Sequence, residues 1–174
     1  MLFRSVVLCG SLPAGLPAET YGSFTSYAVD AGVPVVLDAG GSVLANGAVR
    51  GPALVMPEQA SDVAGLATQR ATSVVLATDS AVQARTPEGE WAAEIGAGAV
   101  AAARRSQPAE PELDVFRDGL VAGFVPGIAL GWSWPDMLRN ALALALAATP
   151  DGEVDLAAYE AVLPEVVVTG PRPH

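Results

Sequence analysis

Small polar and acidic residues stand directly after four short apolar segments of the sequence, and one further aspartate stands before a longer apolar run. The residues that follow the segments are Ser11, Asp38, Glu58 and Asp79. Asp118 precedes Gly119–Phe124. A carboxylate at a helix N-terminus is stabilised as the anion by the free amides, and the same amides can bind a phosphoryl group. Ordinary turn chemistry or a plain helix cap explains each residue taken alone.

Other kinds of site are disfavoured by the composition. The one cysteine, Cys9, excludes an internal disulfide and a cysteine zinc cluster. The one histidine is the last residue, His174, which leaves none for a catalytic triad or a histidine metal site within the sequence. All nine basic residues are arginines and the net charge is −10. Arg104–Arg105 is the only basic pair, so we expect no nucleic-acid partner.

The apolar content of 51% does not predict a membrane protein. The longest apolar runs, Gly119–Gly131 and Ala141–Ala148, are shorter than the 18 or so apolar residues that a membrane-spanning helix needs. The first residues lack the pattern of a secretory signal. We therefore expect a cytoplasmic protein with no membrane partner.

Four continuous apolar segments predict strands that are covered on both faces, as in parallel sheets. Helical patterns lie between them, so we predict a three-layer α/β/α fold with a mostly parallel sheet. Ligands of such sheets bind beyond the carboxyl ends of the strands, where the polar residues named above would gather. The predicted strands are Ser5–Cys9, Val33–Asp38, Ala53–Met56 and Ser73–Ala77, and the predicted helices are Ala18–Asp30, Ser42–Ala48 and Glu58–Ala67.

The rest of the chain predicts a hairpin, a loop, three helices and a last strand. The hairpin pairs Ala81–Ala84 with Glu90–Glu94 around the turn Thr86–Gly89, and the loop covers Gly96–Glu112. We expect one domain over residues 1–170 and a loose tail over 171–174. The helices run from Asp114 or Asp118 to Gly131, from Ser133 to Ala148, and from an Asp155 cap to Leu163, and the strand is Val166–Thr169.

The order of these motifs resembles that of the PfkB-type, ribokinase-like carbohydrate kinases, especially the 1-phosphofructokinase and tagatose-6-phosphate kinase branch. Gly10–Pro13 reads Gly-Ser-Leu-Pro, as in the family, and Leu37-Asp38 ends the next strand. Met56-Pro57-Glu58 stands where the family has Lys-Pro-Asn. Leu76–Ala81 stands where it has Leu-Gly-Ala-Asp-Gly-Ala. Val115–Asp118 replaces Gly-Ala-Gly-Asp, with the family's Ala-Gly-Phe following. The resemblance spans nearly the whole chain.

The resemblance implies a fold, a reaction and a set of site residues. The fold is ribokinase-like, here truncated at its N-terminal side. The reaction is ATP-dependent phosphoryl transfer to a sugar or sugar phosphate, with Mg²⁺ and with Asp118 as the base. The amides of Val115, Phe116 and Arg117 would form the anion hole, and Gly10 and Ser11 the substrate-side loop. Glu58 and Ser61 occupy the positions that organise magnesium and phosphates. The nucleotide-binding positions are Val75, Leu76, Ala77, Thr78, Asp79 and Ser80.

The departures from the family pattern are as specific as the matches. Glu58 and Ser61 replace the Asn and Glu of the family's Asn-x-x-Glu, although Glu58 or Asp62 can partly substitute for them. Family glycines are replaced at Ala77, Ser80, Val115 and Arg117. Glycine permits positive φ and close backbone approach, both of which a β-branched valine disfavours.

These departures leave three functions open. The first is a sugar or sugar-phosphate kinase that uses ATP and magnesium and is completed by another chain, and we separately expect a homo-oligomer or a complementing chain. The second is a non-catalytic pseudokinase remnant that binds nucleotide or a partner, and the third is a truncated product with no function of its own. If nucleotide binds, we expect its groove between residues 75–80 and the helix near Asp118. Binding should be weak, because the −10 charge repels ATP.

Overall fold

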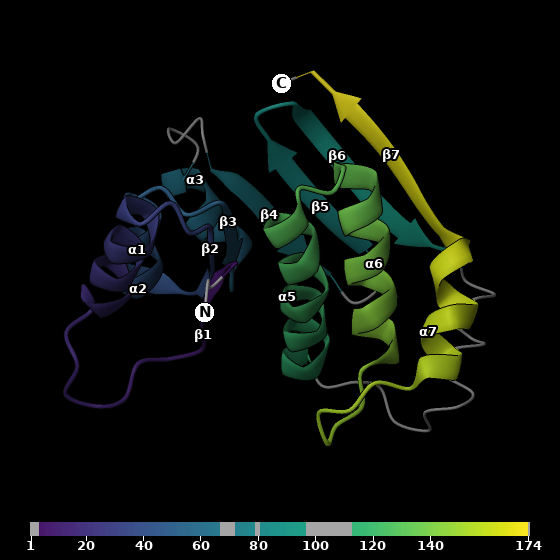
Figure 1. The fold of residues 1–174 in the computed structure, drawn as a ribbon, viewed down its shortest axis with the longest axis horizontal. Helices are drawn as coiled ribbons and strands as arrows, with labels where there is room; N and C mark the ends of the chain where they lie inside the picture. The colour runs from purple at the N-terminus through teal and green to yellow at the C-terminus, as the bar shows by residue number, and fades with distance from the viewer. Residues whose placement is uncertain (1–3, 67–71, 79–80, 97–112, 174) are drawn as a thin grey trace. The chain divides into compact units, whose positions relative to one another are not determined.

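The computed structural model describes residues 4–66, 72–78, 81–96 and 113–173 of the chain (Figure 1). The chain divides into two compact units. Unit 1 comprises Met1–Leu76, Ala84–Glu90 and Pro173–His174, and unit 2 comprises Ala77–Gln83 and Trp91–Arg172. The single domain over residues 1–170 stays a prediction.

The described strands form a seven-stranded sheet in which spatial order follows sequence order, β1 to β7. The first four strands are parallel, with Cys9 opposite Asp38 and Asp38 opposite Met56. Their carboxyl ends therefore share one edge. The strands are β1 (Val6–Cys9), β2 (Val35–Ala39), β3 (Leu54–Pro57), β4 (Ser73–Ala77), β5 (Ala81–Thr86), β6 (Gly89–Ile95) and β7 (Val166–Arg172).

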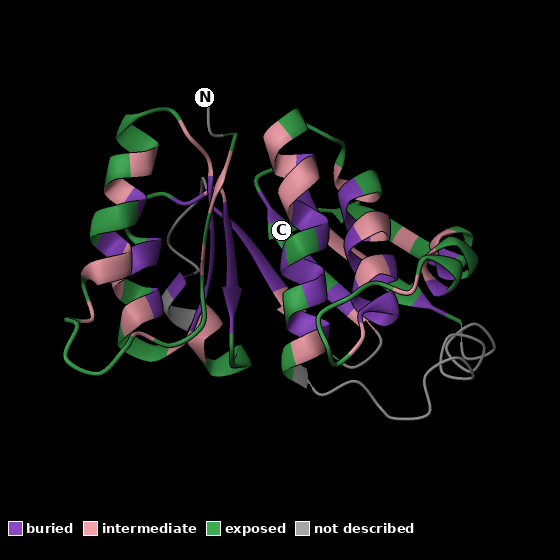
Figure 2. Cartoon of the chain, turned by 60° about the horizontal axis from the view of Figure 1, so that its bottom comes forward, coloured by how far each residue is buried: buried purple, intermediate pink, exposed green. Residues whose placement is uncertain are grey.

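Unit 1 builds its core between β2, β3 and the helices beside them. β2 and β3 are buried along their whole length, as their continuous apolar sequences predict (purple in Figure 2). Helices α1 (Thr20–Asp30) and α2 (Gly41–Ala48) pack together, and the connection after β3 forms η1 (Ala60–Asp62) and α3 (Val63–Leu66). The core cluster comprises Leu37, Ala39, Leu44, Ala48, Val55, Leu66 and Val74.

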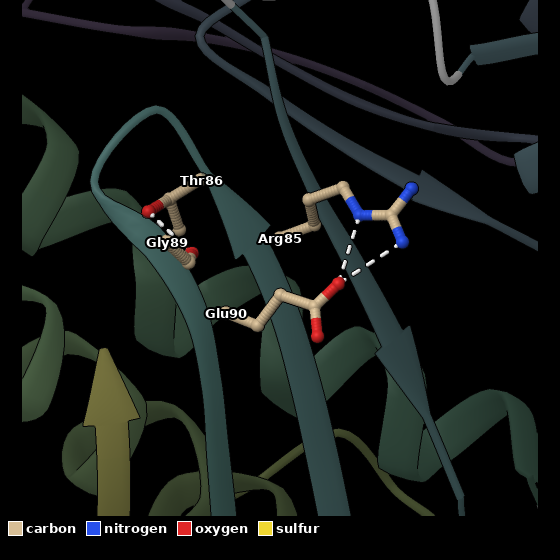
Figure 3. Close-up of polar contacts among 4 residues, drawn as sticks. All are labelled: Arg85, Thr86, Gly89 and Glu90. Carbon is tan, nitrogen blue, oxygen red and sulfur yellow. Dashed lines mark hydrogen bonds and ion pairs between the residues drawn. The ribbon is translucent and has the colours of Figure 1, made fainter. Parts of the chain in front are cut away.

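A tight turn joins β5 and β6 as the sequence predicts (Figure 3). The hydroxyl of Thr86 donates to the carbonyl of Gly89 over 2.9 Å. Gly89 has φ +136°, a conformation that favours glycine. Across the pair, Arg85 donates to Glu90 Oε1 over 3.0 Å, in an exposed ion pair worth at most about 1 kcal/mol. The turn residues therefore set the register of the hairpin.

Unit 2 is built on helices α5 (Leu113–Leu130), α6 (Trp134–Ala147) and α7 (Leu156–Val162), followed by η2 (Leu163–Glu165) (Figure 1). Ser133 caps α6 by accepting from the Asp136 amide, and Asp155 Oδ1 caps α7 by accepting from two amides, over 3.0 and 3.1 Å. Phe124 of α5 contacts Trp134 of α6, with ring centroids 6.4 Å apart. These caps confirm the predicted starts of α6 and α7.

The predicted α/β class with its mostly parallel sheet is confirmed, and the differences are local. The predicted helix Glu58–Ala67 is reduced to η1 and the short α3 in the described residues. β7 continues to Arg172, past the predicted end at Thr169, so two residues of the predicted loose tail belong to the strand. Most of the predicted loop Gly96–Glu112 lies outside the described residues.

Within the described ranges, no helix is both long enough and apolar enough to cross a membrane. The cytoplasmic location remains a prediction of the sequence.

Candidate active site

An open hollow of about 420 Å³ lies in unit 1 beyond the carboxyl ends of β1, β2 and β3. One wall is the loop that follows β1, and the other combines the end of β2 with the first residue after β3. Ser11 and Glu58, from different strand ends, therefore line the same hollow, as expected for parallel strands. The lining residues are Gly10–Leu16, Ala18, Ala39, Gly40, Val43 and Glu58.

Glu58 is the one ionisable side chain among the described lining residues, and it lies against the backbone of Gly40. A Cβ on Gly40 would come within 2.8 Å of Glu58 Cδ. The glycine thus leaves room for the carboxylate at the strand ends. Ser61 does not join it: its hydroxyl donates to Gln59 Oε1 over 3.4 Å, and it lines a separate hollow of about 340 Å³. The structure therefore does not bring Glu58 and Ser61 into one site.

The loop that carries Ser11 is held by a residue that we did not predict, Tyr21 of α1. Its phenol donates to the carbonyls of Cys9 and Gly10, over 2.7 and 3.2 Å. The amide of Gly10, at φ +78°, donates to the Asp38 carbonyl over 3.2 Å. Burial raises the pKa of Tyr21, and the nearby Cys9 and Asp38 add to the rise. The phenol therefore keeps its proton and donates at neutral pH.

Asp118 is exposed and lies on α5 in unit 2. Of the two aspartates expected to open this helix, Asp114 lies in the first turn. Asp118 lies five residues after the first described helical residue, so it belongs to the second turn. An interior position gives a carboxylate much less stabilisation from free amides than the N-terminus does. The Asp118 side chain is accessible to solvent, and this residue does not open the helix.

The three residues before Asp118 are also part of α5. Only the first few amides of a helix lack an intrahelical acceptor, so the amides of Phe116 and Arg117 are committed to the helix, and that of Val115 lies in the first turn. The Phe116 side chain belongs to the core. Arg117 is only 9% exposed and has an interaction partner. In the described residues these positions are helical, and the anion hole expected at Val115, Phe116 and Arg117 stays a prediction.

The predicted nucleotide-binding segment follows β4. Val75 is fully buried, Leu76 and Ala77 are half-buried, and Thr78 is exposed. The amide and hydroxyl of Thr78 both donate to the Ala81 carbonyl, over 2.9 and 3.1 Å. Asp79 and Ser80 lie outside the described residues.

A magnesium site of protein ligands alone does not fit the described residues. No group of three or more His, Cys, Asp or Glu side chains gathers among them. Mg²⁺ that binds with nucleotide phosphates uses one or two carboxylates. Glu58 supplies one carboxylate, and Ser61 lies in the other hollow.

The sequence is 30% identical over 158 residues to 1-phosphofructokinase from Rhodobacter capsulatus, a stretch covering 82% of this chain and 48% of that protein. No protein-family model matches the chain. The chain therefore spans about half the length of the curated relative that it matches.

Several solved structures share the fold. A Staphylococcus aureus protein described as a phosphofructokinase superposes with a TM-score of 0.74 at 20% identity, over 95% of this chain and 57% of that chain. Phosphofructokinase-2 from Escherichia coli superposes with a TM-score of 0.68 at 19% identity, over 91% of this chain and 55% of that chain. Its structures include a tetrameric inhibited form and a complex with fructose-6-phosphate. The predicted resemblance is thus confirmed: the chain has the ribokinase-like fold of the PfkB-type phosphofructokinases over about half their length, with sequence similarity to 1-phosphofructokinase.

Proposed function

We propose that the chain is a PfkB-type carbohydrate kinase domain that supports ATP-dependent phosphoryl transfer to a sugar or sugar phosphate. The observation that carries the proposal is the similarity to 1-phosphofructokinase along most of the chain, together with the matching fold. Asp118 stands at the position of the family's base and is exposed to solvent. A carboxylate there can accept the proton of the attacking hydroxyl while the phosphoryl group moves from ATP to that oxygen.

The hollow in unit 1 supports binding of a polyhydroxylated ligand. Backbone groups of the Gly10–Gly15 loop, the Ser11 hydroxyl and the Glu58 carboxylate can exchange hydrogen bonds with sugar hydroxyls. The described lining residues include no positively charged side chain that could pair with a phosphate group. The phosphate of a sugar phosphate would therefore need residues from elsewhere in a complete kinase. For this reason the proposal includes a complementing chain or a second copy, and we expect the 174-residue chain alone to lack measurable turnover.

The departures around Asp118 support a second candidate, a non-catalytic domain that binds nucleotide or a partner chain. The helix runs through the family's anion-hole positions, and Arg117 replaces the glycine before the base. Loss of one well-placed donor to a developing anion costs about 100- to 1,000-fold in rate. A buried arginine could instead stabilise phosphoryl charge itself, as arginine fingers do.

A chimera separates the two candidates. We would replace the matching stretch of Rhodobacter capsulatus 1-phosphofructokinase with this chain and assay ATP-dependent phosphorylation of fructose 1-phosphate, fructose 6-phosphate and tagatose 6-phosphate. The kinase candidate predicts turnover that disappears in Asp118→Asn and survives in Asp114→Asn, a matched exposed carboxylate one turn earlier. A further fall in Arg117→Gly would identify the arginine as catalytic.

The non-catalytic candidate predicts a different pattern. The chimera that keeps Val115 and Arg117 of this chain would show no turnover. It would gain turnover when Val115→Gly and Arg117→Gly restore the family's glycines. A folded chimera that stays silent even then would overturn the assignment of Asp118 as a base. Folding is checked independently by circular dichroism and by the unfolding midpoint.

A further inference from the structure

Thr20 and Tyr21, the first two residues of α1, hydrogen-bond to the two ends of the loop that follows β1 and lines the hollow in unit 1. At the far end, the Thr20 amide and hydroxyl donate to the Pro17 carbonyl, over 3.0 and 2.7 Å. At the near end, the Tyr21 phenol donates to the carbonyls of Cys9 and Gly10. The loop is long for a βα connection, yet both of its ends are tied to one helix turn.

The near end is the part that carries Ser11. Gly10 takes a left-handed conformation and donates its amide to Asp38 of the neighbouring strand, so its carbonyl is turned toward α1 and accepts from Tyr21. The Tyr21 ring packs against the unit 1 core cluster, which fixes the place from which the phenol donates. The backbone on either side of the Cys9–Gly10 peptide is thereby held from two directions.

We propose that Tyr21 is a positioning residue, whose phenol fixes the start of the Gly10–Gly15 loop and so presents Ser11 and the loop backbone to a hydroxyl-bearing ligand in the hollow. The ligand part of this inference rests on the proposed function. A loop held before binding loses less conformational entropy when a ligand orders it, which strengthens binding without any new contact to the ligand.

The matched variants are Tyr21→Phe and Tyr27→Phe. Both remove one phenol oxygen from α1 and keep the ring. Tyr27 is 72% exposed and lies outside the loop, so its variant controls for the substitution itself. Because the Tyr21 ring stays packed in the core, Tyr21→Phe should fold.

The first readout needs no ligand. Cys9 is already exposed, so the readout at the held end of the loop is the hydrogen exchange of the Gly10 amide, which donates to the Asp38 carbonyl. Amide hydrogen exchange over residues 10–15 reports on the loop itself. A hydrogen bond typically contributes a net value of about 0.5–1.5 kcal/mol. Its loss in Tyr21→Phe should therefore make opening of the loop about 2- to 12-fold more frequent. We expect both rates to rise by a factor in that range, with no change in Tyr27→Phe. Unchanged rates in Tyr21→Phe would overturn the inference.

The second readout uses fructose 6-phosphate as the probe and is made in the chimera described above, which supplies the residues that the hollow of this chain lacks for the phosphate. Tyr21→Phe should weaken its binding by the factor by which it lowers the fraction of molecules with the loop held, and saturating probe should return the loop exchange toward the wild-type rate. A tyrosine that only stabilises the fold would lower the unfolding midpoint and leave the probe affinity unchanged, which would also overturn the inference. Looser exchange in Tyr21→Phe without probe binding to either protein would support the hold on the loop and count against the proposed function.

Discussion

Tyr159 on α7 donates its phenol to Oδ1 of Asn140 on α6, with the two oxygens 2.7 Å apart. Nδ2 of the same asparagine donates to the Gly123 carbonyl on α5 over 2.6 Å. Both side chains are half-buried. One amide group therefore links the three helices of unit 2, through its acceptor on one side and its donor on the other.

Replacing Asn140 with alanine should destabilise unit 2. The change removes two hydrogen bonds and leaves the Tyr159 hydroxyl without its acceptor, at an expected cost of about 1–3 kcal/mol. Urea unfolding followed by circular dichroism measures the cost. Arg139→Ala is the matched control, because its 3.5 Å ion pair with Asp136 is exposed and should contribute less than about 1 kcal/mol. Equal midpoints for the two variants would contradict the prediction.

Close packing of α5 on α6 makes Gly119 a second position at which a substitution should destabilise unit 2. A Cβ on Gly119 would lie 2.6 Å from Cα of Ala145 and 3.2 Å from Cβ of Ala148. Gly119→Ala should therefore destabilise by about 1–3 kcal/mol through overpacking, despite the better helix propensity of alanine. Ala122→Ser, on the exposed side of the same helix, should change stability by less than about 0.5 kcal/mol. Greater thermal stability in Gly119→Ala than in the wild type would show that the helices can move apart.

The strands and the shared edge of the site could be predicted because both follow from short-range pattern. Continuous apolar segments predicted β1 to β4 to within two residues. Parallel pairing then placed Ser11 and Glu58 at the same edge, and both line the hollow. The expected burial on two faces holds for β2 and β3, whereas β1 is only partly buried, and the common strand direction alone places Ser11.

Two features of the site could not be predicted in this way. Tyr21 looks like an ordinary core aromatic in the sequence, since its bond to Cys9 depends on how α1 is rotated about its axis. The signal that could have found it is an aromatic hydroxyl in the first turn after a glycine loop. The sequence left the start of α5 open between Asp114 and Asp118, and the first described turn contains Asp114. Val115, Phe116 and Arg117 carry side chains where the family has a glycine-containing loop, and non-glycine residues lose less entropy in a helix. The helix therefore extends backwards past Asp118.

Titration of Tyr21 should affect stability at alkaline pH. Its pKa is raised above the ordinary tyrosine value of 10.0, first by burial and then by Cys9 and Asp38. The unfolded chain loses this proton first, so the stabilisation is complete below about pH 10 and is lost as the pH rises through the higher folded-state pKa. Tyr21→Phe should lose stability less steeply than Tyr27→Phe between pH 9 and 11, by urea midpoints at each pH. Parallel pH profiles for the two variants would contradict this.

The outer edge of β1 should make the 174-residue chain self-associate. β1 is the first strand in the order of the described sheet and pairs there only with β2, so one side of its backbone lacks a partner strand in the described residues. Its residues are only partly buried, and Val7 is 36% exposed. An unpaired strand edge is a template for pairing with another chain. The chain covers 48% of the curated 1-phosphofructokinase and 57% of the Staphylococcus aureus protein. We expect sedimentation of a species larger than the 17.6 kDa monomer at working concentration.

Val7→Lys should shift the distribution toward the monomer, because a charge on an edge strand opposes pairing. Val29→Lys is the matched control, since Val29 is 38% exposed but lies on α1, away from the edge. A wild-type chain that sediments as a stable monomer, or a Val29→Lys variant that dissociates as readily as Val7→Lys, would show that β1 is not the associating edge.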